Sequence, residues 1–301
     1  MRCIGEGVGV VDRYIQVSHE PAHDLGGLLP VTHACILYAM RVVSLAVYVP
    51  VPYAAQRLAT LGAHVTAVEP PGGDPMATWC PGYYAELRGG QHVRRLDLKT
   101  ADGRAAFAEL LSQADLLLTS FRLSALRLLG LDWERLTVDY PRLSHVALVG
   151  AAATDDERPT HDLMLQAWAG LVSPPSLPPT LIADLAAGER IVSTGLSLLL
   201  GDRPGFACVS LEDAVKPFAA PLRHGLTTPG AMLGGGLQSY RLYRASDGWI
   251  AVAAIEPRFW SALVGALGEG LADAFAAAPA LYWEEWAAER DIPIAAVRVT
   301  A

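Results

Sequence analysis

The hydrophobic and polar positions of this chain alternate between strand-like and helical patterns from Arg41 onward. The apolar, β-rich runs RVVSLAVYV (41–49) and HVTAVE (64–69) flank PVPYAAQRLATLGA (50–63), which begins on proline and has helical spacing. A helix between two such strands, joined by short connections, is typical of a parallel sheet covered by helices. The alternation continues to about Gly201. It predicts an α/β domain with a Rossmann-like parallel sheet and helices on both faces.

The same patterns divide the whole chain into parts. Residues 40–201 are expected to form the large domain, because strand-like and helical runs alternate throughout them. The Gly/Pro-rich stretch 202–234 predicts a linker or active-site loop. Residues 235–301 predict a smaller α+β domain with a hairpin that turns at Ser246-Asp247-Gly248. Residues 1–39 match neither domain and receive no assignment.

Composition and charge limit the possible partners. The chain has 301 residues, of which 52% are hydrophobic, and its formal net charge is −8. This charge argues against binding to nucleic acid or to an anionic membrane. The apolar run 34–51 is interrupted by Arg41 and closed by prolines, so a buried strand is favoured over a membrane span. The four cysteines are widely spaced and no leader-like segment is evident, which indicates a cytoplasmic protein.

One concentration of basic residues stands out in this acidic chain. An anionic ligand would need such a local site. On charge alone, however, we interpret the concentration as a solvated face. Its members are Arg88, Arg94, Arg95, Lys99, Arg104, Arg122 and Arg127.

The first predicted strand-to-helix turn argues against one common use of such a sheet. Its sequence, VYVPVPYAA (47–55), contains no glycine. A Rossmann dinucleotide site needs glycines there so that the backbone can approach the pyrophosphate. Glu69 stands where a ribose-binding acid would fall, but without those glycines its position is a coincidence of topology. A nicotinamide oxidoreductase is therefore disfavoured.

Acid and base residues stand at the ends of three predicted elements. In ERPTHDLMLQAWAGL (157–171), His161 and Asp162 lie where a polar loop meets an apolar helix. Histidine ordinarily titrates near neutrality and suits a general base, and the start of a helix can hold a developing enolate oxygen. Asp184 follows an apolar run, and Glu256 follows a predicted strand. Each carboxylate could equally be a helix cap, and His161 an ordinary histidine.

Six segments of the chain, taken in order, resemble one known family, the family III CoA-transferases, and within it the α-methylacyl-CoA racemases. They extend from about Arg41 to Val299. Histidine directly before aspartate at 161–162 is similar to the racemase branch, whereas the transferase branch carries this aspartate after a glycine-aromatic pair. The segments are PYAAQRLATLGAHVTAVEPPGGDPM, LDLKTADGRAAF, ADLLLTSFR with LGLDWERL, RPTHDLMLQAWAGL, LIADLAAG and GGGLQSYRLYRASDGWIAVAAIEPRFW.

The resemblance implies 1,1-proton transfer at the α-carbon of an acyl-CoA thioester. His161, oriented by Glu256, would remove the α-proton from one face, and Asp184 would return a proton to the other. The backbone N–H of Asp162 would hold the enolate oxygen. No metal or redox cofactor is implied, because the thioester already acidifies the α-proton. The resemblance also places coenzyme A contacts at four residues: Asp97, Leu98, Lys99 and Arg122.

Departures from the family pattern keep other functions open. The family's proline-glycine after Phe121-Arg122 is replaced by Leu123-Ser124, and its glycine-rich loop is reduced to VGAAATDDERP (149–159). The family's C-terminal return segment, which completes an interlocked dimer, is expected to be absent, although a homodimer is still the expected assembly. One alternative is a CoA-transferase that forms an acyl anhydride at Asp162. The other is a degenerate, non-catalytic subunit that binds acyl-CoA or a partner.

Overall fold

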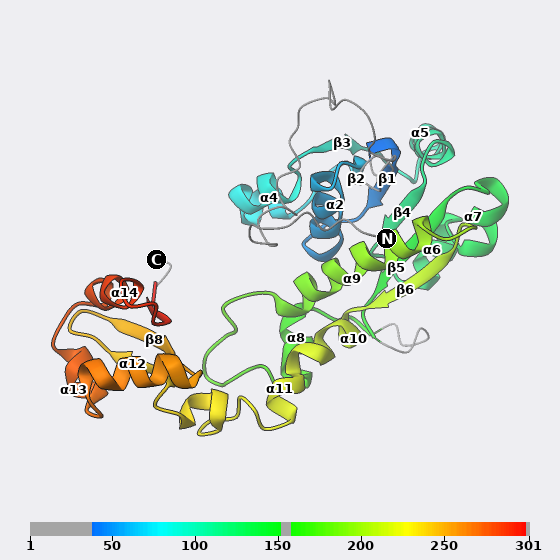
Figure 1. The fold of residues 1–301 in the computed structure, drawn as a ribbon. Helices are drawn as coiled ribbons and strands as arrows, with labels where there is room; N and C mark the ends of the chain where they lie inside the picture. The colour runs from blue at the N-terminus through cyan, green and yellow to red at the C-terminus, as the bar shows by residue number, and fades with distance from the viewer. Residues whose placement is uncertain (1–37, 152–157, 299–301) are drawn as a thin grey trace, which may run out of the picture. The chain divides into compact units, whose positions relative to one another are not determined.

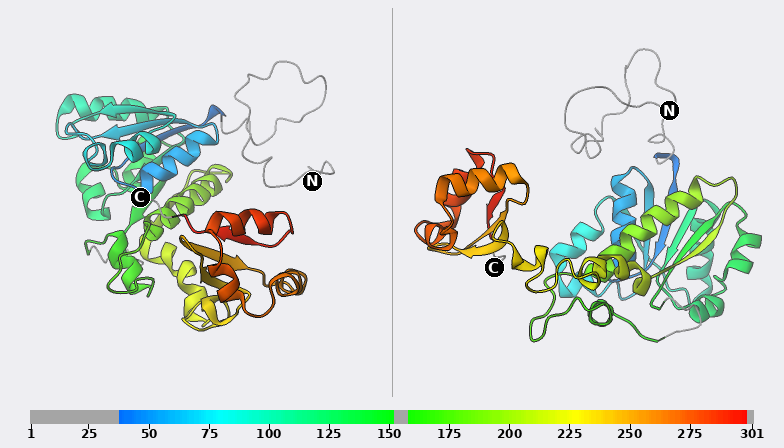
Figure 2. Two further views of the ribbon diagram at one scale, coloured as in Figure 1. Left: turned by 90° about the vertical axis from the view of Figure 1, so that its left-hand side faces the viewer. Right: turned by 60° about the horizontal axis from the view of Figure 1, so that its bottom comes forward.

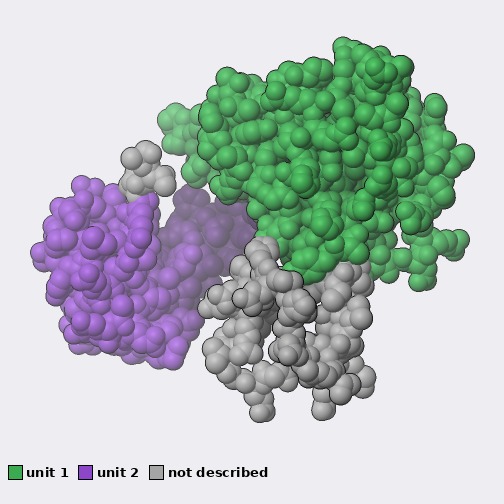
Figure 3. Space-filling model, turned by 90° about the horizontal axis from the view of Figure 1, so that it is seen from above, with its two compact units in different colours: residues 1–216 green, residues 217–301 purple. Residues whose placement is uncertain are grey.

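The computed structural model describes residues 38–151 and 158–298 of the chain. The chain divides into two compact units, Met1–Lys216 (unit 1) and Pro217–Ala301 (unit 2), which Figure 3 colours separately. Each unit has its own hydrophobic core. Within the described part of the chain, every helix is too short or too polar to cross a membrane. Most of the unassigned stretch 1–39 lies outside the described residues.

Unit 1 is built on a parallel sheet. Six strands of the described residues pair in the order β3-β2-β1-β4-β5-β6, all in the same direction (Figure 1). The strand order reverses between β1 and β4, and in such sheets ligands bind beyond the carboxyl ends of the strands at this point. The predicted α/β fold with a Rossmann-like sheet is confirmed. The strands are β1 (Arg41–Leu45), β2 (His64–Glu69), β3 (Gln91–Arg95), β4 (Leu116–Thr119), β5 (Ser144–Val149) and β6 (Phe206–Ser210).

Helices cover both faces of this sheet (Figure 1, Figure 2). On one face, α2 (Pro50–Thr60) packs beside α9 (Ile182–Leu199). The other face is covered by α5 (Ala101–Ser112), α6 (Leu123–Leu129) and α7 (Trp133–Asp139). The central strands are apolar on both faces because both faces are buried. The remaining helices of unit 1 are α3 (Met76–Trp79), α4 (Pro81–Leu87), α8 (Asp162–Trp168) and α10 (Leu211–Val215).

Local sequence signals set the ends of these helices. The first turn of α2 contains proline, and the chain leaves this helix through Gly62, whose φ is 101°. The Thr100 hydroxyl caps α5 by accepting a hydrogen bond from the N–H of Gly103. The run 124–141 is divided into α6 and α7, because Gly130 ends α6 in a left-handed conformation.

Unit 2 combines a small antiparallel sheet with three helices. The predicted hairpin is present as β7 and β8, and β9 pairs with the other side of β8. One face of this sheet packs on the helices around the fully buried Phe275. The elements are β7 (Tyr240–Arg244), β8 (Trp249–Ala253), β9 (Ile294–Ala296), α12 (Pro257–Leu267), α13 (Leu271–Ala276) and α14 (Ala280–Ala288). Short helical segments precede them at Lys216–Ala219, α11 (Ala220–Arg223) and Met232–Gly236.

Three strands differ from the expected pattern. β3 lies at the edge of the sheet and four of its five residues are exposed, so it lacks the apolar alternation that marks a strand. β6 lies inside the stretch 202–234. This stretch was expected to be a linker or loop, because the short apolar run of β6 follows a Gly/Pro-rich turn. β9 has only three residues. The boundary between the two units also falls inside the stretch 202–234, after Lys216.

Candidate active site

The loops at the carboxyl end of the parallel sheet enclose a cavity of about 290 Å³. Both His161 and Asp184 line it, so the structure brings together two of the residues that the sequence singled out. They reach it from different elements, the N-terminus of α8 and the first turn of α9. We call this the His161 cavity. Its other lining residues are Val47, Tyr48, Pro50, Ser120, Arg122, Leu123, Leu148, Val149, Gly150, Arg158, Pro159, Thr160 and Leu211.

His161 occupies the N-cap position of α8. Its backbone is extended (φ −139°, ψ 161°), its side chain is exposed, and within the described residues that side chain makes no capping hydrogen bond. The loop before it lies close to the end of β5, because a Cβ atom at Gly150 would collide with the Thr160 hydroxyl. A larger residue at position 150 would therefore require the Thr160 side chain, next to His161, to move.

The Asp162 carboxylate is buried and caps a different helix from its own. Only 6% of Asp162 is exposed. Its Oδ1 accepts hydrogen bonds from the backbone N–H groups of Ala183 (2.8 Å) and Asp184 (3.2 Å), at the start of α9. Its Oδ2 accepts a hydrogen bond of 2.6 Å from the Gln166 side chain. The carboxylate therefore ties the start of α8 to the start of α9.

Among the described residues that line the His161 cavity, Asp184 supplies the carboxyl group. Burial, and secondly the negative charge of Asp162, raise the pKa of Asp184 to about 7. At neutral pH this group can therefore both hold and release a proton. A strongly shifted carboxyl group that lines a cavity is typical of an active site.

A second cavity, of about 580 Å³, opens beside the first. Asp97, Leu98 and Lys99 all line it, which groups three of the expected coenzyme A contacts. The fourth, Arg122, lines the His161 cavity instead. We call the second space the Lys99 cavity. Both cavities share three lining residues, Val47, Tyr48 and Ser120.

The wall formed by Asp97, Leu98 and Lys99 is held in shape by local hydrogen bonds. Asp97 Oδ1 accepts a hydrogen bond from the Lys99 N–H (3.0 Å), and the Thr100 hydroxyl donates to the Asp97 carbonyl (2.9 Å). A Cβ atom at Gly103 would collide with that same carbonyl. The first turn of α5 thus packs directly on the backbone that lines the Lys99 cavity.

Glu256 belongs to unit 2 and stands at the N-cap of α12, three residues after the end of the strand β8. Its side chain is exposed and makes no capping hydrogen bond within the described residues. The structure therefore assigns Glu256 to a different compact unit from His161 and Asp184.

Two features of the site gave no clear signal in the sequence. Arg158 lines the His161 cavity, and its guanidinium lies 5.2 Å from the centre of the Trp168 ring.

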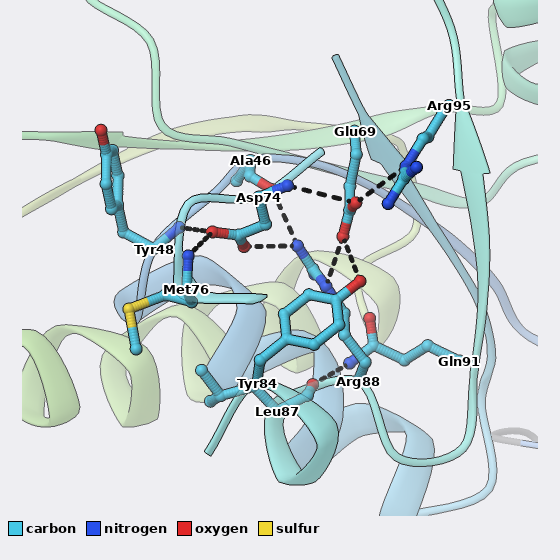
Figure 4. A network of polar contacts seen from close by, with 10 residues as sticks. All are labelled: Ala46, Tyr48, Glu69, Asp74, Met76, Tyr84, Leu87, Arg88, Gln91 and Arg95. Atoms are coloured by element: carbon cyan, nitrogen blue, oxygen red, sulfur yellow. Dashed lines mark hydrogen bonds and ion pairs between the residues drawn. The ribbon is translucent and has the colours of Figure 1, made fainter. Parts of the chain in front are cut away.

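The interpretation of the basic residues as a solvated face is wrong for Arg88, which is only 7% exposed. Arg88 pairs with Glu69 and Asp74 in a buried network (Figure 4). In the sequence, only the acidic residues Glu69 and Asp74 hinted at this pairing, because local patterns do not show which residues pair across a long stretch of chain.

Comparison with known proteins identifies the family. The sequence profile of CoA-transferase family III matches residues 37–200 and 213–282. The chain belongs to CoA-transferase family III. The matched segments include His161, Asp184 and Glu256, and they extend over both units.

Members of two kinds are similar to this family III chain. It is 30% identical over 260 residues to the alpha-methylacyl-CoA racemase of Homo sapiens, a match that covers 77% of the chain but 65% of the racemase. It is 26% identical over 276 residues to the succinate–glutarate CoA-transferase of Agrobacterium fabrum, covering 78% of the chain and 67% of that enzyme. The chain thus spans about two thirds of the length of these relatives.

Solved structures of similar proteins share the fold. A hypothetical protein from Mycobacterium tuberculosis has a TM-score of 0.74 at 24% identity, with 86% of this chain and 83% of that chain covered. A CAIB/BAIF family protein from Brucella suis has a TM-score of 0.73 at 22% identity, with 87% and 84% covered. At these identities the likeness concerns the fold alone.

Proposed function

We propose that the protein is a racemase or epimerase of α-substituted, 2-methyl type acyl-CoA thioesters, acting by 1,1-proton transfer through an enolate. The observation that carries this proposal is that His161 and Asp184 line one cavity. Racemisation at one carbon requires two groups, because each must act as the base for one enantiomer and as the acid for the other. The similarity to alpha-methylacyl-CoA racemase supports the same function.

The protonation of Asp184 fits its role. His161 removes the α-proton from one face of the thioester, and Asp184 gives a proton to the carbanion from the opposite face. A carboxyl group with an ordinary pKa would hold almost no proton at neutral pH. The raised pKa of Asp184, about 7, lets it act as an acid in one direction and as a base in the other. The backbone N–H of Asp162 is the proposed donor to the enolate oxygen.

The position of Asp162 favours a racemase over a CoA-transferase. A transferase nucleophile needs a carboxylate oxygen that can reach the thioester carbonyl. Here both oxygens of Asp162 accept hydrogen bonds within the protein, and the residue is 6% exposed. The similarity to CoA-transferases keeps that function as the second candidate.

The two cavities provide room for both ends of an acyl-CoA. We assign the nucleotide to the larger Lys99 cavity, where Leu96, Leu98 and Phe121 offer apolar walls for a base. The thioester then lies in the His161 cavity, and the pantetheine arm passes the shared residues. Positive charge for the phosphates is supplied by Lys99 in the Lys99 cavity and by Arg122 in the His161 cavity, in an otherwise acidic chain. The expected role of Glu256 in orienting His161 stays a prediction.

We further infer that the protein assembles as a homodimer. Three large apolar side chains of α8 are exposed: Leu163, Met164 and Trp168. Grouped exposed apolar side chains are typical of a surface that binds another protein. Analytical ultracentrifugation should give the mass of a dimer, and a monomer over the whole concentration range would contradict this inference.

Inversion of a pure enantiomer tests the proposed activity. Purified protein is incubated with (R)-2-methylacyl-CoA, and the enantiomers are separated over time. We expect the wild type to produce the (S)-thioester, and His161→Ala or Asp184→Asn to abolish this. His64→Ala is the matched control, because His64 is exposed at the amino end of β2, the opposite edge of the sheet. The control should invert the substrate at the wild-type rate.

Other outcomes of the same experiment separate the alternatives. A transferase would leave the enantiomer unchanged, would tolerate His161→Ala, and would form an acyl anhydride at Asp162 that hydroxylamine traps. A non-catalytic subunit would bind acyl-CoA in calorimetry without either reaction. Each of these results would overturn the proposed racemase.

A further inference from the structure

Tyr48 stands where the two cavities meet and has an unusual backbone conformation. It lines both the His161 cavity and the Lys99 cavity, and it is 39% exposed. Its φ angle is 70°, in the left-handed region that bulky residues other than glycine seldom adopt. Such strain persists only where surrounding structure enforces it, and it occurs most often at functional sites.

A buried carboxylate, that of Asp74, bonds to the backbone of this residue. The N–H of Tyr48 donates a hydrogen bond of 3.2 Å to Asp74 Oδ1, which also accepts one of 3.0 Å from the Met76 N–H. Arg88 Nη2 lies 2.8 Å from Asp74 Oδ2 and 3.4 Å from the carbonyl oxygen of Ala46. The Asp74–Arg88 pair therefore holds two backbone groups of the turn between β1 and α2, one on each side of Val47 (Figure 4).

Glu69, at the end of β2, fixes Arg88 in turn. Its Oε1 accepts hydrogen bonds of 3.0 Å from both Arg88 Nε and the Tyr84 hydroxyl. Its Oε2 accepts a hydrogen bond of 3.3 Å from the Asp74 N–H and lies 3.9 Å from Arg95 Nε. Glu69 is fully buried and both of its carboxylate oxygens are engaged within the protein, so it is a structural anchor.

Such a network is a costly way to stabilise a fold. Burying charged groups costs hydration free energy, and their mutual attraction offsets that cost only in part. Apolar residues of similar size often stabilise a fold as much as a buried ion pair does. What a network of this kind does supply is a defined geometry, since each hydrogen bond restricts direction as well as distance. In this protein, the network defines the position of the Tyr48 backbone.

We propose that the Glu69–Arg88–Asp74 network is a positioning device that holds the Tyr48 ring at the junction of the two cavities, where the ring contacts the pantetheine arm of the bound thioester. The inference rests on the proposed acyl-CoA function. The ring centre of Tyr48 lies 5.6 Å from that of Trp79, with the two ring planes tilted by 33°, and this contact restricts the ring from one side. Tyr48 is thus a specificity-determining residue for the arm, and Asp74 and Arg88 are positioning residues that act through it.

Replacing the ring while keeping the backbone tests the contact. Glycine adopts a φ of 70° without strain, so Tyr48→Gly removes the ring and leaves the turn intact. In calorimetry we expect Tyr48→Gly to bind acyl-CoA about tenfold more weakly, the usual loss for one aromatic contact. Tyr48→Phe keeps the ring and should bind within about twofold of the wild type.

Binding of two fragments of acyl-CoA shows which part of the ligand the Tyr48 ring contacts. An S-acyl-pantetheine should lose the same factor on Tyr48→Gly, because it contains the arm. Adenosine bisphosphate, the nucleotide half of coenzyme A, should bind both proteins equally. Equal loss for both fragments would mean general damage to the site, and would overturn the proposal.

A double-mutant cycle tests whether the network acts through Tyr48. Asp74→Asn keeps an oxygen for the N–H groups of Tyr48 and Met76 but removes the charge opposite Arg88. If Asp74 acts by placing the ring, Asp74→Asn should weaken acyl-CoA binding in the wild type and have little further effect in Tyr48→Gly. Additive losses in folded variants would overturn the positioning role.

The result also separates this proposal from the proposed function. Tyr48→Gly that binds and inverts acyl-CoA as the wild type does would overturn only the role of Tyr48. A wild-type protein that binds no acyl-CoA would overturn both.

Discussion

Asp162 Oδ1 lies 3.2 Å from the backbone nitrogen of Asp184 and accepts its hydrogen bond. This contact joins the first residue of α8 to the first turn of α9, so the two helices that present His161 and Asp184 are fixed to each other at their N-termini. The same carboxylate carries the charge that contributes, after burial, to the raised pKa of Asp184. One side chain therefore influences both the spacing and the protonation of the proposed proton-transfer pair.

Replacing Asp162 by asparagine should change the pH dependence of the reaction more than the fold. The amide oxygen can still accept from the N–H groups at the start of α9, but the negative charge is lost. The pKa of Asp184 should then fall below about 7, although burial, the larger cause, still raises it. The limb of the pH–rate profile that requires protonated Asp184 should shift to lower pH, and the rate at neutral pH should fall severalfold in the direction in which Asp184 donates.

The control for this variant is Asp162→Ala, which removes the acceptor as well as the charge. Loss of a helix cap ordinarily costs about 1 kcal/mol of stability, so Asp162→Ala should melt at a lower temperature than Asp162→Asn. Complete loss of activity in Asp162→Asn with an unchanged melting temperature would indicate a nucleophile and contradict the structural role.

His145 should make the stability of unit 1 depend on pH. It is fully buried on β5, with Nε2 3.0 Å from the Thr119 hydroxyl, and burial lowers its pKa to about 4. The unfolded chain binds this proton below about pH 6.5, whereas the folded chain does not until about pH 4. The contribution of His145 to the free energy of unfolding should therefore decrease as the pH falls through this window, by up to about 3 kcal/mol.

His145→Gln isolates this contribution, because glutamine does not titrate and can still bond to Thr119. Asp184, whose folded pKa is raised, has the opposite sign in the same window, but it is present in both proteins. Urea unfolding between about pH 7 and pH 5 should show the stability of the wild type falling relative to that of His145→Gln as the pH decreases. Identical pH slopes would contradict the assignment.

A methyl group at Gly103 should disturb the Lys99 cavity. The added Cβ would collide with the Asp97 carbonyl, and a backbone atom cannot move aside cheaply. We expect Gly103→Ala to be destabilised by about 1–3 kcal/mol and to bind acyl-CoA more weakly, as measured by thermal unfolding and calorimetry. Gly82→Ala in α4 is the matched control: nothing lies within 4 Å of its Cβ. It should be neutral or up to about 1 kcal/mol more stable, with unchanged binding.

The fold was predictable where burial imposes a period on the sequence. The central strands β1, β2, β4 and β5 are covered on both faces, and their apolar runs are evident without a structure. Edge strand β3 was not evident, because solvent tolerates any side chain on its exposed positions. The short strands β6 and β9 are defined by their pairing partners, which local patterns do not contain.

The site was predictable to a smaller extent. His161 and Asp184 stand at element ends, where polar side chains after an apolar run are visible in sequence. The role of Asp162 as a cap of α9 could not be predicted from sequence, because its partners at the start of α9 lie 21 and 22 residues further along the chain. The pairing of Glu69 with Arg88 spans 19 residues, and the left-handed Tyr48 bonds through its N–H to Asp74, 26 residues further along the chain. Long-range polar contacts have no period, and only the folded chain reveals them.

The most direct test of the two-base account is α-proton exchange in D₂O, followed by proton NMR separately for each pure enantiomer of a 2-methylacyl-CoA. With one base removed, the remaining base should still exchange the proton on its own face without inverting the carbon. We predict that His161→Ala retains exchange for one enantiomer only and that Asp184→Asn retains it for the other only. Loss of exchange for the same enantiomer in both variants, or no exchange in folded wild-type protein, would contradict the proposal that these residues flank the α-carbon.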